Sequence, residues 1–158
     1  CLAIGIDKYI PFWPIWIWPY SFIYYIMIGM VVVQISSLAE GLYHIFGGLM
    51  LLLAQGICFM IFPCRVPKSY REYEIKNLST RYLKFVQALD NGRNCFPSMH
   101  NSVAAYVGIV LLPTIGVWSY VFIASIAVSS LLVKQHQLLD IVPGLLLGWG
   151  IHSLVALL

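Results

Sequence analysis

The sequence predicts an all-α protein, a polytopic bundle of helices embedded in a membrane. Two observations lead to this fold class. The 158 residues are 61% hydrophobic and only 9% charged, and a soluble domain of this length cannot bury so much apolar surface. The apolar residues also fall into five runs, each about as long as a bilayer is thick, with polar turns or one long polar segment between them. We therefore expect one integral-membrane domain over residues 1–158.

The first two apolar runs follow a segment rich in proline and tryptophan. Residues 9–20 contain too much proline for a straight helix, and their aromatic side chains are typical of the head-group level of a bilayer. Residues from Tyr20 to Ser36 carry no charge and predict the first span. A turn is expected from Ser37 to Gly41, and the second span from Leu42 to Pro63.

The only long polar segment covers residues 64–99. It holds seven of the nine Lys and Arg residues against three of the six acids, so the positive charge of the chain is concentrated here. Apolar residues from Tyr70 to Leu89 recur at helical spacing, which predicts an amphipathic helix lying on the membrane and ending at Asp90, Asn91 and Gly92. Basic residues placed between lipid-length runs favour anionic head groups or a phosphorylated lipid as partners, and they argue against nucleic acid.

Three further spans complete the predicted bundle. They are expected over Ser98–Ile115, Val117–Val133 and Leu138–Leu158. The end of the second span, the start of the third, the end of the fourth and the start of the fifth must then lie at one membrane face, because the chain changes sides at each crossing. This alternation brings three polar groups to the same face: Arg65 and Lys68, Ser98 and His100, and Lys134, His136 and Asp140.

The spacing of His136 and Asp140 indicates a nucleophile. Four residues apart, they share one helical face, so the carboxylate can accept a hydrogen bond from one ring nitrogen and leave the other nitrogen basic. An oriented, basic imidazole is suited to accept a phosphoryl group. The competing interpretation is a structural His–Asp pair at the start of a helix.

Ser98 and His100 open the third span. Ser98 follows a proline and is well placed as an N-cap, and free N–H groups at a helix N-terminus bind anions. His100 in the first turn could then protonate a leaving alkoxide, although a capping serine with an incidental histidine would produce the same pattern.

Three cations lie nearest the ends of the spans. Arg65, Lys68 and Lys134 are the candidates for binding a phosphoryl group, whereas the remaining loop cations are interpreted as a solvated or head-group-binding face: Arg71, Lys76, Arg81, Lys84 and Arg93. A metal site built from His100, His136 and Asp140 is the weaker interpretation, and we predict neither a metal nor a cofactor. Cys64 and Cys95 flank the polar segment, so a disulfide between them is an open alternative.

These residues resemble the motifs of the type 2 phosphatidic acid phosphatase superfamily, K-x6-R-P, P-S-G-H and S-R-x5-H-x3-D. The second motif corresponds to residues 97–100, with Met99 in place of glycine, and the third to Ser129, His136 and Asp140, with Ser130 where an arginine is expected. For the first motif the arginine position is either Arg65 or Lys68, and neither choice places a lysine seven residues earlier. The Lys134–Asp140 stretch and the Pro-Phe-Trp-Pro segment are similar to the membrane branch that includes inositol phosphorylceramide synthase-like proteins.

The resemblance implies a six-helix fold of the acid phosphatase/haloperoxidase type, with an N-terminal span missing from a truncated chain. It implies a metal-independent lipid phosphate phosphatase that forms a phosphohistidine. His136 would be the nucleophile, Asp140 its orienting carboxylate and His100 the acid, with Ser98, Lys134 and either Arg65 or Lys68 around the phosphate. A lipid phosphotransferase and a non-catalytic membrane protein remain as alternatives. The resemblance also implies a site on the exoplasmic or periplasmic face, whereas the basic loop alone would favour the cytoplasm.

Overall fold

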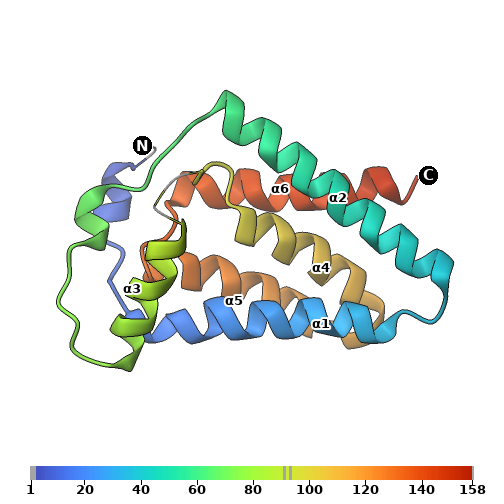
Figure 1. Ribbon diagram of the computed structural model, residues 1–158, viewed down its shortest axis with the longest axis horizontal. Helices are drawn as coiled ribbons and strands as arrows, with labels where there is room; N and C mark the ends of the chain where they lie inside the picture. The colour runs from blue at the N-terminus through green and yellow to red at the C-terminus, as the bar shows by residue number, and fades with distance from the viewer. Residues whose placement is uncertain (1–2, 91, 93, 158) are drawn as a thin grey trace.

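The computed structural model describes residues 3–90, 92 and 94–157, and in these residues the chain is helical and contains no strand. The all-α class predicted from the sequence is therefore confirmed. Figure 1 shows α1, α4, α5 and α6 running roughly side by side, α2 crossing them obliquely and α3 standing at one end of the bundle. The six α-helices are α1 (Tyr24–Gln34), α2 (Leu38–Ile61), α3 (Leu78–Asp90), α4 (Met99–Ile115), α5 (Trp118–Leu132) and α6 (Leu138–Val155).

Within the described residues, three helical stretches are long and apolar enough to cross a bilayer. They are Pro14–Gln34 with 21 residues, Leu38–Ile61 with 24 and Leu138–Val155 with 18. The predicted third and fourth spans correspond to α4 and α5, which are apolar but shorter, with 17 and 15 residues. Helix α4 packs most extensively against α5 and α6, and its side chains form much of the buried core, including Ala104, Val107 and Leu111.

Residues 9–20 form no straight α-helix, as predicted, but part of this segment is helical. Pro14 opens a 3₁₀ turn and Pro19 opens a π turn, and these turns continue into α1. Proline is tolerated at the first position of a helical turn because no intrahelical partner is needed there, so the two prolines start turns instead of ending them. Ile17 and Tyr20 are buried in the core, while Trp13 is 54% exposed.

The amphipathic helix of the polar segment is shorter than predicted from the sequence. Helix α3 begins at Leu78, and only a 3₁₀ turn at Lys68–Arg71 precedes it within the predicted range. The side chain of Asn77 accepts a hydrogen bond from the Thr80 amide at 2.9 Å, and this cap fixes the start of the helix. Of the predicted terminating turn, Asn91 lies outside the described residues, and Gly92 has a φ of +65° that favours glycine.

Two glycines of α6 allow α4 to approach closely. A Cβ atom at Gly144 would lie 2.6 Å from the carbonyl oxygen of Ser98, and one at Gly148 would collide with the carbonyl oxygen of Ser102. Small residues four apart are a common means of close helix contact in membranes. The amide of Ser98 also donates to the carbonyl oxygen of Asp140 at 3.0 Å. The starts of α4 and α6, which carry the two motif-like stretches, are therefore held together.

Candidate active site

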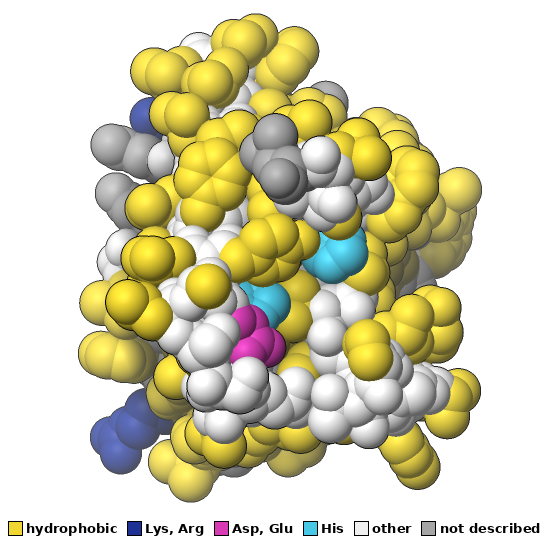
Figure 2. Space-filling model, turned by 90° about the vertical axis from the view of Figure 1, so that its right-hand side faces the viewer, with side chains coloured by type: hydrophobic (Ala, Val, Ile, Leu, Met, Phe, Trp, Pro, Cys, Tyr) yellow, Lys and Arg dark blue, Asp and Glu magenta, His cyan; other side chains and the backbone are white. Residues whose placement is uncertain are grey.

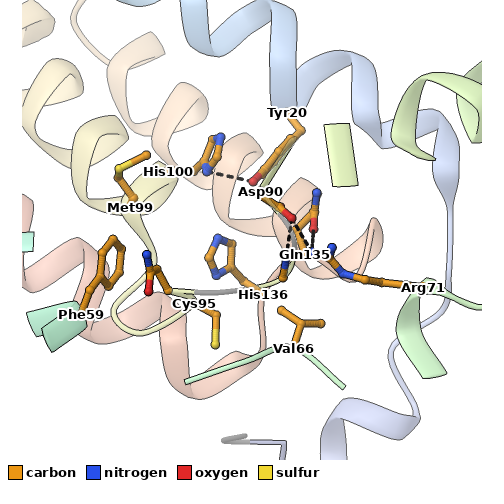
Figure 3. A pocket seen from close by; sticks show the side chains of 12 residues that line it. Tyr20, Phe59, Val66, Arg71, Asp90, Cys95, Met99, His100, Gln135 and His136 are labelled. Atoms are coloured by element: carbon orange, nitrogen blue, oxygen red, sulfur yellow. Dashed lines mark hydrogen bonds and ion pairs between the residues drawn. The ribbon is translucent and has the colours of Figure 1, made fainter. Parts of the chain in front are cut away.

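A cavity of about 220 Å³ (Figure 3) lies at the end of the bundle where α3 stands. Side chains reach it from the segment before α1, from α2, from the polar segment, from α4 and from the turn between α5 and α6 (Figure 3). The lining residues are Tyr20, Phe59, Val66, Arg71, Asp90, Gly92, Asn94, Cys95, Met99, His100, Gln135 and His136. The two histidines predicted from the sequence to be catalytic, His100 and His136, thus line the same cavity.

His136 and Asp140 lie close together at the start of α6. The Nδ1 atom of His136 is 3.6 Å from Oδ2 of Asp140, which is slightly longer than a hydrogen bond, and the carboxylate is fully buried. Oδ2 also accepts from the amide of Gln137 at 2.9 Å, whereas His136 Nδ1 and Asp140 Oδ1 have no hydrogen-bond partner among the described residues. A small rotation of the ring would bring Nδ1 of His136 within hydrogen-bond distance of the Asp140 carboxylate. Nε2 would then be the basic nitrogen of the imidazole.

His100 faces His136 across the cavity and is held by two tyrosines. The ring centroids of the two histidines are 6.2 Å apart. The Nδ1 atom of His100 is 2.8 Å from the hydroxyl oxygen of Tyr20, whose ring also stacks on the imidazole at a centroid distance of 4.3 Å (Figure 3). The ring of Tyr24 contacts the same imidazole at 4.9 Å. One nitrogen of His100 is thus occupied by Tyr20, and the other is left for a ligand.

Ser98 is a capping residue and does not line the cavity. It is fully buried, and its Oγ accepts from the Asn101 amide at 3.4 Å and from the Asn101 side chain at 2.8 Å. The neighbouring turn is fastened to α2, because Gln55 donates to the carbonyl oxygen of Pro97 at 2.7 Å and accepts from Ser102 at 3.0 Å. In an apolar helix such paired polar groups fix one arrangement of the chain, so this network positions His100.

None of the three cations that were predicted from the sequence to bind a phosphoryl group lines the cavity. Arg65 and Lys68 are exposed on the polar segment. The ammonium of Lys134 donates to the backbone oxygen of Asp7 at 2.8 Å and lies 5.0 Å from the ring centroid of Tyr70. Burial lowers the pKa of Lys134, and the nearby charge of Asp7 opposes that effect. Lys134 therefore ties the N-terminal segment to the turn between α5 and α6.

The cation that does line the cavity is Arg71, which the sequence interpretation assigned to the head-group face. Its guanidinium donates to the carbonyl oxygen of Gln87 at 2.7 Å, to Asp90 at 2.6 Å and to Gln135 at 3.3 Å. It rests against Gly92, where a Cβ atom would lie 2.8 Å from the guanidinium carbon. These partners lie far from Arg71 in sequence, so no local pattern distinguishes it from the other loop cations.

Two residues that line this cavity each have a buried N–H donor without a partner among the described residues. The donors are Nε of Arg71 and Nε2 of Gln135. A buried donor without an acceptor costs about 1–3 kcal/mol, so such groups indicate a missing ligand or water. Arg71 and Gln135 therefore carry unused hydrogen-bonding capacity beside the cavity, and the positive charge of Arg71 favours an anion there.

The cysteines near the site permit a direct test of the disulfide alternative. Cys58, Cys64 and Cys95 are free, and the amide nitrogen of Cys95 lies 3.5 Å from the carbonyl oxygen of Cys64. Burial raises the pKa of the Cys95 thiol to about 12, with a smaller contribution from the charge of Asp140. The reactive thiolate of Cys95 is therefore scarce at neutral pH.

We expect maleimide at pH 8 to label the half-exposed Cys64 and to leave Cys95 unlabelled, equally with and without reductant. Peptide mass spectrometry reads each cysteine separately. Labelling of Cys64 that appears only after reduction would demonstrate a disulfide.

No protein-family model, curated protein or solved structure matches this chain.

Proposed function

We propose that the chain is a membrane-embedded lipid phosphate phosphatase of the type 2 phosphatidic acid phosphatase kind, working through a phosphohistidine at His136. The observation that carries this proposal is that one cavity is lined by two histidines, with ring centroids 6.2 Å apart, and by Arg71 and Gln135, each of which has an N–H donor without a partner among the described residues. An imidazole nucleophile, an imidazole acid and an oxyanion site are the groups that phosphoryl transfer through histidine needs.

In the proposed reaction, Nε2 of His136 attacks the phosphorus atom of a lipid phosphate. The bond from phosphorus to the lipid oxygen breaks, and His100 gives its proton to the leaving alkoxide. His100 then accepts a proton from water as the water oxygen attacks the phosphohistidine, which releases inorganic phosphate and restores both imidazoles. Asp140 stabilises the positive charge that His136 carries while its Nε2 is bonded to phosphorus.

Arg71 and Gln135 are the proposed binding groups for the phosphoryl oxygens. Charge spreads over the equatorial oxygens in the transition state, and preorganised donors in a dry site stabilise it strongly. The carboxylate of Asp90 lies 2.6 Å from a guanidinium nitrogen of Arg71 and partly neutralises its charge. A phosphate, which carries more negative charge than a carboxylate, then competes with Asp90 for the guanidinium. Ser98 and its cap hold the start of α4 and with it His100.

We further propose a multi-pass arrangement in which α4 and α5 cross the bilayer together with the three longer stretches. Both helices are apolar, and α4 is largely enclosed by its neighbours, so their shorter length is compatible with a locally thinned bilayer. The cavity then lies at one membrane face, where a lipid phosphate presents its head group. Following the resemblance, we assign this face to the exoplasmic or periplasmic side.

The test is phosphate release by detergent-purified protein from a panel of lipid phosphates, with EDTA, and with and without an alcohol acceptor. Release that resists EDTA and needs no alcohol supports a metal-independent hydrolase. Transfer that requires the alcohol would favour the phosphotransferase. Absence of both from folded protein would favour a non-catalytic membrane protein.

Tyr20→Phe should slow turnover about tenfold without unfolding the protein. The substitution keeps the ring that stacks on His100 and removes only the hydroxyl that lies 2.8 Å from Nδ1, so the imidazole loses the partner that fixes its tautomer and orientation. We expect kcat to fall with little change in KM, measured as phosphate release at several pH values. An unchanged pH profile and unchanged kcat would mean that Tyr20 only packs against His100.

A further inference from the structure

The N-terminal segment of the chain reaches the turn that carries His136. A 3₁₀ turn at Gly5–Lys8 lies at the end of the bundle where α3 stands and α6 begins (Figure 1). Asp7 of this turn is only 2% exposed, and the reaction proposed above does not use it. Because a buried carboxylate is costly unless hydrogen bonds compensate it, the partners of Asp7 show what holds it there.

The carboxylate of Asp7 caps helix α6 from a distant part of the chain. Its Oδ2 accepts from the amide of Ile4 at 2.8 Å, and its Oδ1 accepts from the amide of Leu138 at 3.0 Å. Leu138 is the first residue of α6 and follows His136 by two positions. The first amides of a helix have no acceptor within the helix, and negative charge is favoured beside them. Asp7, 131 residues earlier, supplies that acceptor.

Asp140 accepts from the neighbouring amide of the same turn. Its Oδ2 binds the amide of Gln137 at 2.9 Å, so two buried carboxylates hold consecutive amides at the start of α6. The same Oδ2 lies 3.6 Å from Nδ1 of His136. Since that distance is slightly longer than a hydrogen bond, a small displacement of the turn decides whether His136 and Asp140 pair. The position of the turn backbone therefore controls the orientation of the imidazole.

The backbone of this turn adopts a conformation that needs support. Lys134 has a φ of +56°, which is uncommon for a residue with a side chain and persists where the surrounding structure holds it. Its ammonium donates to the backbone oxygen of Asp7 at 2.8 Å. The amide of Trp13 also donates to the carbonyl oxygen of Leu132 at 2.9 Å. The N-terminal segment thus contacts the turn before and after His136.

We infer that Asp7 is a positioning residue for the proposed nucleophile: by capping α6 it holds His136 where Asp140 can fix the tautomer with Nε2 basic. The inference rests on the proposed function and adds the N-terminal segment to its site. Asp7 does not line the cavity, so it acts through the turn and not on the substrate. Its loss should therefore slow the attack on phosphorus more than it weakens substrate binding.

Asp7→Ala should lower kcat for phosphate release about tenfold to a hundredfold with little change in KM, because misplacement of a reacting group slows the chemical step. Asn77→Ala is the matched control. Asn77 caps α3 through a similar bond, 2.9 Å from the Thr80 amide, and does not line the cavity. This variant should lose stability and keep its kcat. An equal fall of kcat in both variants, or a rise of KM alone in Asp7→Ala, would overturn the inference.

Asp7→Asn covers the case in which Asp7→Ala does not fold. The amide group has one acceptor oxygen in place of two, so it can serve the amide of Leu138 or that of Ile4 but not both. We expect a smaller fall of kcat than in Asp7→Ala, again at nearly constant KM. A folded Asp7→Asn with the kcat of wild type would mean that Asp7 does not position His136.

Nitrogen NMR of protein labelled with ¹⁵N-histidine reads the imidazole without any turnover. In wild type at pH 8, the His136 signals, identified by their loss in His136→Ala, should show a protonated Nδ1 and an unprotonated Nε2. Asp7→Ala should mix the two tautomers, and Asn77→Ala should not. His44 and His152 are internal references, since they lie near the start of α2 and the end of α6, where Figure 2 shows two histidines and one acidic side chain.

The two readouts separate failure of this inference from failure of the proposed function. Absence of phosphate release by wild type would contradict the proposed function, whereas a tautomer change confined to His136 in Asp7→Ala would still establish that Asp7 positions this imidazole. Phosphate release by wild type, with His136 signals that neither Asp7→Ala nor Asp7→Asn alters, would contradict the role of Asp7 and leave the proposed function intact.

Discussion

His136→Ala should abolish phosphate release from lipid phosphates, with a loss of at least about a thousandfold in kcat. The substitution removes the atom that bonds to phosphorus, and the facing imidazole of His100 is held in its place by Tyr20. The released phosphate is measured directly. The folded state is checked by thermal unfolding in detergent, since His136 is 92% buried and its truncation leaves a hole beside Asp140.

Trapping of the intermediate distinguishes a nucleophile from a residue that merely shapes the site. Brief reaction of wild type with a ³²P-labelled lipid phosphate, followed by denaturation, should yield label that is stable to base and lost in acid, as expected of phosphohistidine. His136→Ala should yield none. His100→Ala should retain the label, and accumulate it on a substrate with an activated leaving group, because attack by water then lacks its base.

Asp140→Asn should reduce phosphate release less than His136→Ala does. The amide has the shape of the carboxylate but cannot stabilise a positive imidazole, so kcat should fall about a hundredfold while the label still forms slowly. Label that survives in His136→Ala would remove His136 from the nucleophilic role and would leave the His136–Asp140 pair as a structural contact at the start of α6.

The elements that the sequence predicts well are those defined by local chemistry. The third predicted span, Ser98–Ile115, matches α4 within one residue, because Ser98 caps the helix and Gly116, with a φ of +56°, ends it. The fourth matches α5 equally well. Alternation of the spans then brings His100 and His136 to one end of the bundle, so much of the candidate site follows from helix boundaries alone.

The elements that the sequence does not predict depend on tertiary contacts. The segment before α1 contains three prolines and reads as interfacial, yet Tyr20 and Ile17 are buried against α3 and the α5–α6 turn. Motif spacing placed the cationic role on Arg65 or Lys68, whereas the fold carries Arg71 into the cavity through Gly92 and Asp90. Position along the chain does not reveal which loop cation the fold turns inward.

Arg71→Ala should reduce kcat/KM for a lipid phosphate about a hundredfold to a thousandfold, which is about 2.7–4 kcal/mol of transition-state stabilisation. The reason is the loss of the cation that lines the cavity. Arg71→Lys keeps the charge but not the planar fork, so it should recover only part of the loss. Arg81→Ala on the exposed face of α3 is the matched control and should behave as wild type.

Arg71 also has a structural role that the experiment must separate from binding. Its bonds to the Gln87 carbonyl and to Asp90 hold the end of α3, so Arg71→Ala should also lower stability, by about 1–3 kcal/mol. Two readouts isolate the binding role. Inhibition by inorganic phosphate should weaken in Arg71→Ala, and added guanidinium at low concentration should restore part of the activity without restoring stability.

Comparison of kcat/KM among alanine variants shows which cation binds the phosphoryl group, one predicted from the sequence or the one that lines the cavity. If Arg71 binds the phosphoryl group, Arg65→Ala and Lys68→Ala should change kcat/KM less than about threefold, since both side chains are exposed and off the cavity. Lys134→Ala should lower stability more than activity, because its ammonium holds the backbone of Asp7. A larger loss of activity from Arg65→Ala or Lys68→Ala than from Arg71→Ala would mean that the polar segment rearranges when substrate binds, bringing the motif-spaced cation to the phosphate and turning Arg71 out.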